Sequence, residues 1–334
     1  MRHYLLTISL VCIFLSCKGQ DRVQIVSFNT DSFAGFDKKE PERELYRDSS
    51  KITYSVFVSG KTIIVTHPRG ENSHAIDLLD LDTQEPLNHL IDFEEEWFSP
   101  LASLYKDTLI VRDNIVNRVA LVDIGEAARD RTYKPETREV NYFSVRFIPV
   151  GKRFIFWNPY GHDQRFPRVL VSDEDGNYEY PPSTPKTEPH NVDHGDLLFN
   201  KEKDIIVLAH KNEPTIDLMH SDGIIYKKLE FDHPAPEIGE FNIGGTIKYI
   251  YKGKTINYFP SASSVKNLFA VAYAETGSTS KILFFDWDGN LTSGFKVAGE
   301  CIHSISFSPE GKYVYSWEKD GNSYVLREYQ SGLE

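Results

Sequence analysis

The sequence has little of what would support a helical, disulfide-linked or nucleic-acid-binding protein. Its 334 residues include only 3 Cys and 2 Met, and no long stretch has the apolar spacing of an amphipathic helix. Lys and Arg number 37 against 49 Asp and Glu, which gives a formal net charge of −12. Nucleic acid is therefore excluded as an expected partner, because a polyanion is bound by a cationic surface that releases its counterions.

The sequence also lacks the short motifs of several large enzyme classes. It contains no G-x-S-x-G, no glycine-rich phosphate loop and no Cys-x-x-Cys. Two matches to S-x-x-K, Ser103–Lys106 and Ser263–Lys266, fall at the same hairpin of a repeated unit. We interpret them as repeat geometry rather than nucleophiles, and we expect Cys301 to be a structural thiol.

No apolar run at the N-terminus is long enough to span a bilayer, which takes about 20 residues. Arg2 is followed by an apolar run from Tyr4 to Leu15, the length of a signal-peptide core. Phe14–Cys17 then resembles a bacterial lipobox, so we expect cleavage before Cys17 and lipidation of its thiol. The alternative is an ordinary secretory signal with a chance cysteine.

The lipobox resemblance defines the expected domains and location. Residues 1–16 are the signal peptide, residues 17–21 a lipidated tether and residues 22–334 a single folded domain. Lys18 at the second mature position resembles lipoproteins sent to the outer membrane. We therefore expect a cell-envelope lipoprotein on the periplasmic side or the cell surface, with the membrane as a partner through the lipid anchor.

The residues that are abundant favour strands. Aromatic residues make up 13% of the chain, with 21 Phe and 18 Tyr. One hairpin pattern recurs: a short strand with small or polar residues, a turn with Gly, Lys, Asp or Asn, and a nearly all-apolar strand that must be covered on both faces. Its copies begin at Ser55, Ala102, Ser144, Asp196, Ser261 and Ser304.

A second hairpin with an acidic turn follows nearly every copy, as at Asp286–Asn290. The unit therefore has four strands, spans about 40 to 65 residues and occurs six times, which is typical of propeller blades. We predict an all-β, six-bladed β-propeller. An extra hairpin within Thr246–Tyr258, around Lys252–Lys254, makes seven blades the alternative.

The last copy lacks a fourth strand after Ser323–Tyr329. We predict that the strand-like run Arg22–Asn29 completes this blade and closes the ring, which removes exposed sheet edges. The charged segment Asp31–Ser50 is expected to cross the outside of the ring and could hold a short helix.

With the hairpin Phe307–Tyr315 and the Asp-Gly turns, the mature chain resembles the six-bladed propeller lipoproteins of Bacteroidetes, a loose set with TolB-like and NHL-like blades. The resemblance covers essentially the whole mature chain. It implies a propeller on a lipid anchor. It implies little about chemistry, because such blades occur in scaffolds, lyases, lactonases and peptidase partners.

Polar residues that follow the second strands could converge at one end of the central tunnel. The candidate binding residues on this tunnel face are His67, Arg69, Arg112, Tyr160, His162, His210 and Trp317. The alternative interpretation is that these loop residues are polar without a shared role. His190, Asp193 and His194 in "EPHNVDHGD" are candidate metal ligands, with turn capping as the alternative.

These observations lead to two functional hypotheses. The first is a non-enzymatic binding or scaffold propeller anchored to the outer membrane, with a protein or carbohydrate ligand and no cofactor. The second is a metal-assisted hydrolase or lyase that acts on a sugar or lactone at the tunnel face, with a divalent metal lowering the pKa of bound water.

Overall fold

The chain is described by a computed structural model for residues 23–49, 55–67, 76–90, 100–113, 118–139, 146–150, 153–157, 169–172, 195–234, 237–243, 246–251, 257–275 and 278–333. Strands dominate it, and its two helical segments are η1 (Thr30–Phe33) and α2 (Ile124–Ala127). Within these residues, no helix combines the length and apolar composition that crossing a bilayer requires. The predicted all-β class is confirmed.

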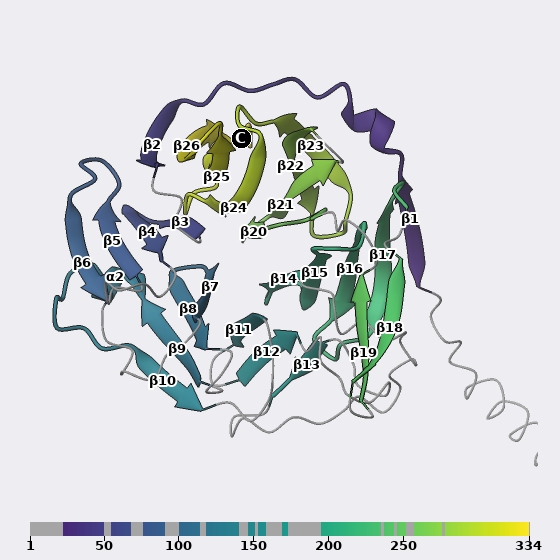
Figure 1. The fold of residues 1–334 in the computed structure, drawn as a ribbon, viewed down its shortest axis with the longest axis horizontal. Coiled ribbons are helices and arrows are strands. Elements are labelled where there is room, and N and C mark those ends of the chain that lie inside the picture. Colours follow the sequence, from purple (N-terminus) through teal and green to yellow (C-terminus); the bar gives the residue numbers. More distant parts are fainter. Residues whose placement is uncertain are drawn as a thin grey trace, which may run out of the picture.

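Small sheets stand around a central axis as the blades of a propeller (Figure 1). The β3–β6 blade consists of β3 (Ser55–Ser59), β4 (Thr62–Thr66), β5 (Ile76–Asp80) and β6 (Pro86–Leu90). The β7–β10 blade consists of β7 (Pro100–Tyr105), β8 (Thr108–Asp113), β9 (Arg118–Asp123) and β10 (Glu136–Glu139). A three-stranded sheet follows, with β11 (Arg146–Val150), β12 (Arg153–Trp157) and β13 (Val169–Val171).

Three more blades complete the ring. The β14–β17 blade consists of β14 (Gly195–Asn200), β15 (Ile205–His210), β16 (Thr215–His220) and β17 (Ile225–Phe231). The β20–β23 blade consists of β20 (Ala262–Val265), β21 (Leu268–Glu275), β22 (Ser278–Asp286) and β23 (Leu291–Lys296). The β24–β26 blade consists of β24 (Cys301–Phe307), β25 (Tyr313–Asp320) and β26 (Ser323–Gln330), with β2 (Arg43–Asp48) as its outer strand.

The predicted burial of the second strand of each hairpin is confirmed for β4 and β15. Every residue of β4 and every residue of β15 is buried, because these second strands pack against neighbouring blades on both faces. The turn after β22 is the hairpin turn that the sequence predicted at Asp286–Asn290, and a side chain supports it. The carboxylate of Asp286 accepts hydrogen bonds from the backbone N–H of Asp288 at 2.9 Å and of Asn290 at 2.8 Å.

The predicted number of blades is wrong. The described residues form five blades of four or five strands, not six or seven. The copy that begins at Ser144 contributes the three-stranded sheet β11–β13, which occupies a place in the ring (Figure 1) without a described fourth strand. A repeat of sequence hairpins predicted the type of sheet, but the number of strands that pair in each copy depends on the surrounding chain.

The predicted closing strand is also wrong, although a strand near the N-terminus does close the ring. β1 (Gln24–Phe28) pairs in parallel with β17, where it is the fifth strand of a different blade. β2 pairs antiparallel with β26, from Arg43 opposite Glu328 to Asp48 opposite Tyr324. The charged segment expected to cross the outside therefore provides both the crossing, with the short helix η1, and the closing strand.

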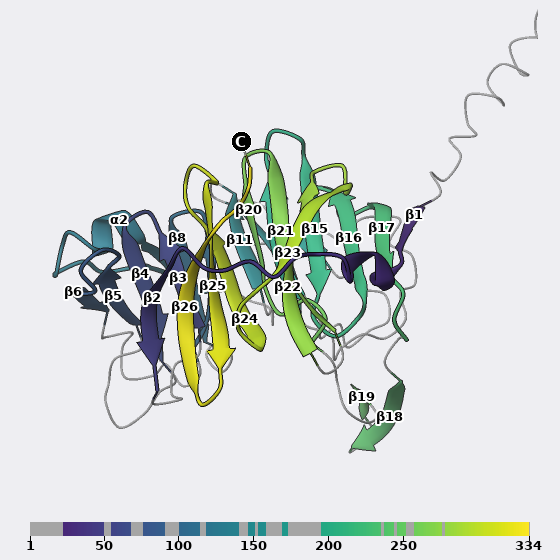
Figure 2. The same cartoon turned by 90° about the horizontal axis from the view of Figure 1, so that it is seen from above.

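The extra hairpin is displaced from its predicted position. β18 (Ile238–Ile243) pairs with β19 (Thr246–Tyr251), with Ile243 opposite Thr246, so the two strands do not turn around Lys252–Lys254. This two-stranded sheet projects from one face of the ring (Figure 2) and is not a blade. The turns between first and second strands lie on the opposite face, which we name the first-turn face (upper side of Figure 2).

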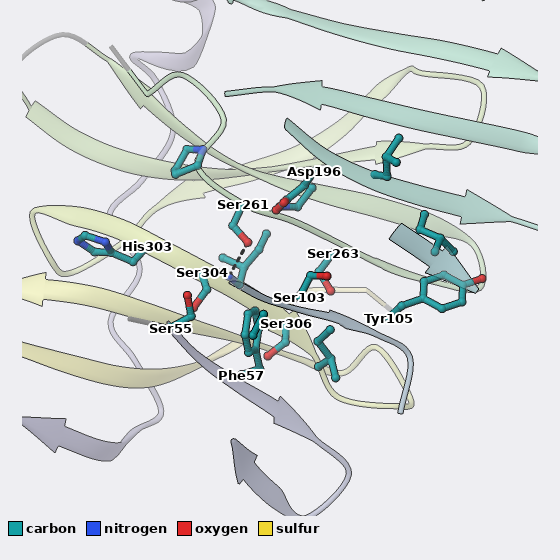
Figure 3. Close-up of a pocket in the computed structure, with 17 residues that line it drawn as sticks. Ser55, Phe57, Ser103, Tyr105, Asp196, Ser261, Ser263, His303, Ser304 and Ser306 are labelled. Carbon is teal, nitrogen blue, oxygen red and sulfur yellow. Dashed lines mark hydrogen bonds between the residues drawn. The ribbon is translucent and has the colours of Figure 1, made fainter. Parts of the chain in front are cut away.

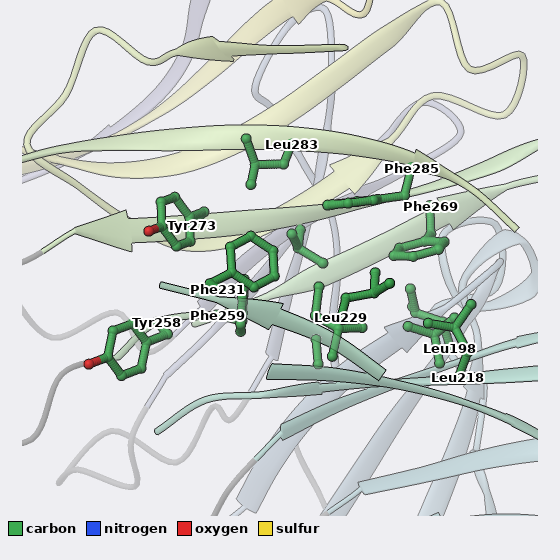
Figure 4. Packing of buried hydrophobic residues seen from close by; sticks show 14 of the residues in the cluster. Leu198, Leu218, Leu229, Phe231, Tyr258, Phe259, Phe269, Tyr273, Leu283 and Phe285 are labelled. Carbon is green, nitrogen blue, oxygen red and sulfur yellow. The ribbon is translucent and has the colours of Figure 1, made fainter. Parts of the chain in front are cut away.

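The largest core cluster lies between the β14–β17 and β20–β23 blades (Figure 4). The Phe231 ring stacks against Tyr273 at 5.4 Å and meets Phe259 edge-on at 4.9 Å. Phe33 of η1 enters the same cluster and has no exposed surface. The segment between β1 and β2 is therefore held to the propeller by core packing.

Candidate functional site

The polar residues at the ends of second strands form hydrogen-bonded clusters inside individual blades. His67 follows β4, and its Nε2 lies 3.0 Å from the Oδ2 atom of Asp77 on β5. The other carboxylate oxygen of Asp77 lies 2.7 Å from Nδ1 of His89 on β6. The hydrogen bond to His67, helped by the bond to His89, lowers the pKa of Asp77 against the opposing effect of burial.

The β14–β17 blade repeats this arrangement in its interior. His210 ends β15, and its Nε2 lies 2.9 Å from Oδ2 of Asp217 on β16. The side chains of both residues have no exposed surface. Nζ of Lys228 on β17 lies 3.8 Å from the second oxygen of Asp217, so three adjacent strands contribute one ionisable group each.

The β24–β26 blade contains the most extensive cluster. Arg327 on β26 lies 3.0 Å from Glu318 on β25 and 3.0 Å from Glu44 on β2. The backbone N–H of Gly299 donates a further bond of 2.7 Å to Glu318. Burial raises the pKa of Glu318, and hydrogen bonds from Tyr329, Arg327 and Gly299 oppose that rise.

The predicted binding residues that the structure describes do not share one accessible surface. His210, Trp317 and Arg112 are 0%, 1% and 2% exposed, respectively. They lie inside separate blades and cannot contact a ligand directly in this structure. His67 is partly accessible but bound to Asp77. Polar residues do lie at the ends of second strands, as the sequence indicated. His67 and His210 interact there with residues on adjacent strands of the same blade.

The remaining candidates lie outside the described residues. These are the binding candidates Arg69, Tyr160 and His162 and the metal candidates His190, Asp193 and His194. In the part of the chain that the structure describes, no group of three or more His, Cys, Asp or Glu residues is arranged to hold a metal ion.

The inner strands of the five blades and of the three-stranded sheet enclose a narrow central channel of about 50 Å³. Serines dominate its wall (Figure 3). The serines that line it are Ser55, Ser103, Ser261, Ser263, Ser304 and Ser306. Small residues allow the inner strands to approach closely, and their hydroxyl groups supply hydrogen-bond partners that a buried strand edge needs.

Several of these serines connect neighbouring blades. Ser304 donates to the backbone oxygen of Val56 at 2.6 Å, and the N–H of Val58 donates to Ser306 at 3.0 Å. Ser261 accepts from the N–H of Ile305 at 3.1 Å. The narrow part of the channel is therefore a seam that holds the blades together.

We expect Ser306→Ala to lower the free energy of unfolding by about 1–3 kcal/mol, because it leaves the buried N–H of Val58 without its acceptor. Urea unfolding of the purified protein measures this change. Ser293→Ala on the exposed part of β23 is the control, with an expected change within about 0.5 kcal/mol. Equal stability of the two variants would show that the seam serine contributes nothing.

A wider cavity of about 450 Å³ opens where the channel reaches the first-turn face. We name it the channel mouth and define it by the turns of five blades. Its wall combines hydroxyl and amide groups, charged side chains and aromatic rings, represented by Ser263, Asn200, Lys106, Asp107 and Tyr105. Tyr105 lines both the mouth and the narrow channel, and burial raises the pKa of its phenol.

Contacts between blades and within a blade fix the wall of the mouth. Ser59 at the end of β3 donates to Asp107 in the first turn of the next blade at 2.7 Å. Trp287 donates through Nε1 to the backbone oxygen of Lys266 at 3.1 Å. The two S-x-x-K matches lie at equivalent hairpins, β7–β8 and β20–β21, as repeat geometry predicts.

The sequence analysis placed its candidate residues after the second strands, on the face opposite the mouth, and did not single out the mouth. A signal was present, because the aligned hairpins carry Lys, Asp, Asn or Ser at their turns. The alignment treated these residues as turn formers. Only the ring shows that turns from five blades surround one space.

His303 lies at the other end of the narrow channel from Tyr105 (Figure 3). Its imidazole is accessible to solvent and meets the Tyr324 ring edge-on at 5.0 Å. Partial desolvation of the ring, together with the charges of Lys211 and Lys319, lowers the pKa of His303.

No protein-family model matches the sequence, and no curated protein matches it significantly. Many solved structures share the fold. A Bacteroides fragilis protein whose name describes it as exported is 10% identical, with a TM-score of 0.53, over 92% of this chain and 99% of that one. A chain of a mitotic checkpoint complex is 12% identical, with a TM-score of 0.51, over 87% and 96% of the two chains.

A member of the DUF4221 family from Bacteroides vulgatus is also similar, with 9% identity and a TM-score of 0.47 over 87% of this chain and 98% of that one. The similarity to the Bacteroides fragilis protein agrees with the coarser part of the sequence resemblance, a Bacteroidetes-like propeller. At these identities the similarity shows the β-propeller fold and nothing about the ligand.

Proposed function

We propose that the protein is an outer-membrane lipoprotein, anchored through Cys17, whose propeller binds a ligand in the channel mouth without transforming it. The observation that supports this proposal is the cavity of about 450 Å³ on the first-turn face. That volume is within the range of about 300–1,000 Å³ that is typical of small-ligand sites.

The lining of the mouth favours a short carbohydrate. Hydroxyl groups from Ser263, Ser264 and Ser308 and the amide of Asn200 supply donors and acceptors around the cavity. The partly buried ring of Tyr105 offers an apolar surface for the face of a sugar ring. A protein segment is the second ligand class that this mixture of groups could accept.

The geometry of the mouth supports binding, because its wall offers polar groups and an aromatic ring around one cavity. Ser103 and Ser263 of the S-x-x-K pairs form part of the channel wall. The metal-assisted hydrolase or lyase remains a prediction that rests on His190, Asp193 and His194. Elemental analysis of the purified protein tests it, because stoichiometric zinc or another divalent metal is required.

We expect Tyr105→Ala to weaken carbohydrate binding at least about tenfold, or about 1.4 kcal/mol, because it removes the aromatic surface of the mouth. The ligand is first identified by screening the full mature chain on an oligosaccharide array. Calorimetry then compares the parent protein and the variant.

Tyr226→Ala is the matched control, because Tyr226 is a partly buried aromatic residue on β17 and does not line the mouth. Equal losses in the two variants would contradict a site at the mouth. If a peptide array yields the only ligand and its binding depends on Tyr105, the mouth is retained and a protein segment replaces the carbohydrate.

A further inference from the structure

The large apolar side chains that the described part of the chain exposes gather at one corner of the propeller. They are Val23, Ile25 and Ile224, with exposed fractions of 42%, 59% and 48%. Val23 and Ile25 lie at the start of β1, and Ile224 directly precedes β17, the strand with which β1 pairs. Single exposed apolar residues are ordinary, but a group confined to one strand pair indicates a contact surface.

Only one face of β1 packs against the core cluster. Val26 and Phe28 pack toward the core cluster, and the Phe28 ring stacks against Phe231 at 5.3 Å. Ile25 directly precedes Val26 on the strand, so its side chain points to the other face. Its apolar character is therefore not required by the propeller core.

Among the described residues, β1 is an edge strand without the usual protection. β1 is the outermost strand of its five-stranded sheet, and its sequence QIVSF contains no charge. Exposed edge strands normally carry lysine, proline or a bulge that prevents association. An uncharged edge beside exposed Val23 and Ile25 is consistent with a surface that is covered in the mature protein.

The position of this corner along the chain indicates what covers it. Residues 18–22 separate Val23 from Cys17, the predicted lipidation site. Six residue steps of at most about 3.6 Å keep Val23 within roughly 20 Å of the acylated sulfur. A lipid anchor on so short a tether holds this corner of the propeller close to the bilayer surface.

We propose that Val23, Ile25 and Ile224 form a membrane-docking surface that inserts into the interfacial region of the bilayer beside the lipid anchor. This inference rests on the lipid anchor of the proposed function. The start of β1 and the turn before β17 lie toward the first-turn face, whereas the β18–β19 hairpin projects from the opposite face (Figure 2). Docking thus fixes which face of the ring is nearer to the membrane.

The test compares two fluorescent positions in the full-length, lipidated protein. An environment-sensitive dye is attached to Ile25→Cys or, as the control, to Glu85→Cys, both with Cys301→Ser to remove the remaining thiol. Glu85 is exposed in the turn between β5 and β6, across the ring from β1 (Figure 1). The proteins are reconstituted in vesicles of phosphatidylethanolamine and phosphatidylglycerol, with and without lipids that carry a nitroxide in the acyl chain.

We expect the dye at position 25 to shift its emission to the blue and to be quenched at least roughly twofold by the nitroxide lipids, because interfacial residues insert about 5–10 Å. The dye at position 85 should keep the emission it has in water. A water-like dye at position 25 in protein that sediments with the vesicles overturns the docking surface and leaves the anchor intact.

Two other outcomes also overturn the inference. Mass spectrometry that finds Cys17 without lipid removes both the anchor and the argument from tether length. A blue shift at position 25 that appears without vesicles and grows with protein concentration identifies a second copy of the chain as the occupant of this surface.

Discussion

Arg327→Met is expected to lower the free energy of unfolding by about 3–5 kcal/mol, because it leaves a buried carboxylate without its cation. The Glu318 side chain has no exposed surface, and Arg327 is its partner at 3.0 Å. Arg327 also binds Glu44 on β2, so the variant weakens the strand that closes the ring. Urea unfolding of the mature protein at neutral pH measures the loss.

The expected pH dependence distinguishes this explanation from a simple loss of packing. The pKa of Glu318 is already raised above its ordinary value of 4.5, so the folded state takes up a proton more readily than the unfolded chain. Without Arg327 that preference increases. The destabilisation should therefore be largest at neutral pH and should shrink as the pH falls through the raised pKa of Glu318.

Two variants serve as controls for the ion pair. Arg47→Met removes an exposed arginine that lies 2.9 Å from Glu44 and 3.3 Å from Asp320, and should cost about 1 kcal/mol or less. The double variant Arg327→Met with Glu318→Leu should recover most of the stability, because no charge remains buried. A double variant as unstable as Arg327→Met alone would contradict the role of the unpaired carboxylate.

Trp317→Ala is expected to lower the free energy of unfolding by about 3–5 kcal/mol, because it creates a large cavity in the core. Trp317 is 1% exposed and stacks against Tyr324 at 5.7 Å. Its ring also lies 5.9 Å from Tyr46 of β2, so it packs against the closing strand. Thermal and urea unfolding measure the effect.

This variant also tests the binding role that the sequence indicated for Trp317. The folded fraction should bind the mouth ligand with unchanged affinity, because Trp317 does not line the mouth. Trp317→Phe should retain more stability than Trp317→Ala, since a smaller cavity remains. Normal stability with abolished binding would restore Trp317 as a binding residue and contradict its role in the core.

Both predictions concern the junction of β2 with β26, which joins residues 43–48 to residues 324–328. An open propeller would leave the edge of the last blade unpaired, and unpaired edges promote association. The polar cluster around Arg327 and the aromatic group around Trp317 lie on this one blade. Ring closure therefore depends on both charge pairing and packing.

The sequence by itself determined the all-β class, the hairpin unit and the positions of its turns. These features follow from local chemistry: alternating or continuous apolar residues define strands, and Asp-Gly or Lys-Asn pairs define turns. The polar residue at the end of several second strands was likewise visible, as with His67 and His210. Each of these features depends on residues that are close to one another in the sequence.

Only the tertiary structure decided which strands pair across long separations. Arg22–Asn29 and Arg43–Asp48 are both strand-like, but Val26 and Phe28 fit the aromatic core beside β17, whereas Glu44 meets Arg327 on β26. The same limit applied to the site. Turns separated by more than forty residues surround one cavity only because the blades are arranged in a ring. His210 and Trp317 are buried because neighbouring blades pack against their strands, and no local sequence pattern specifies that packing.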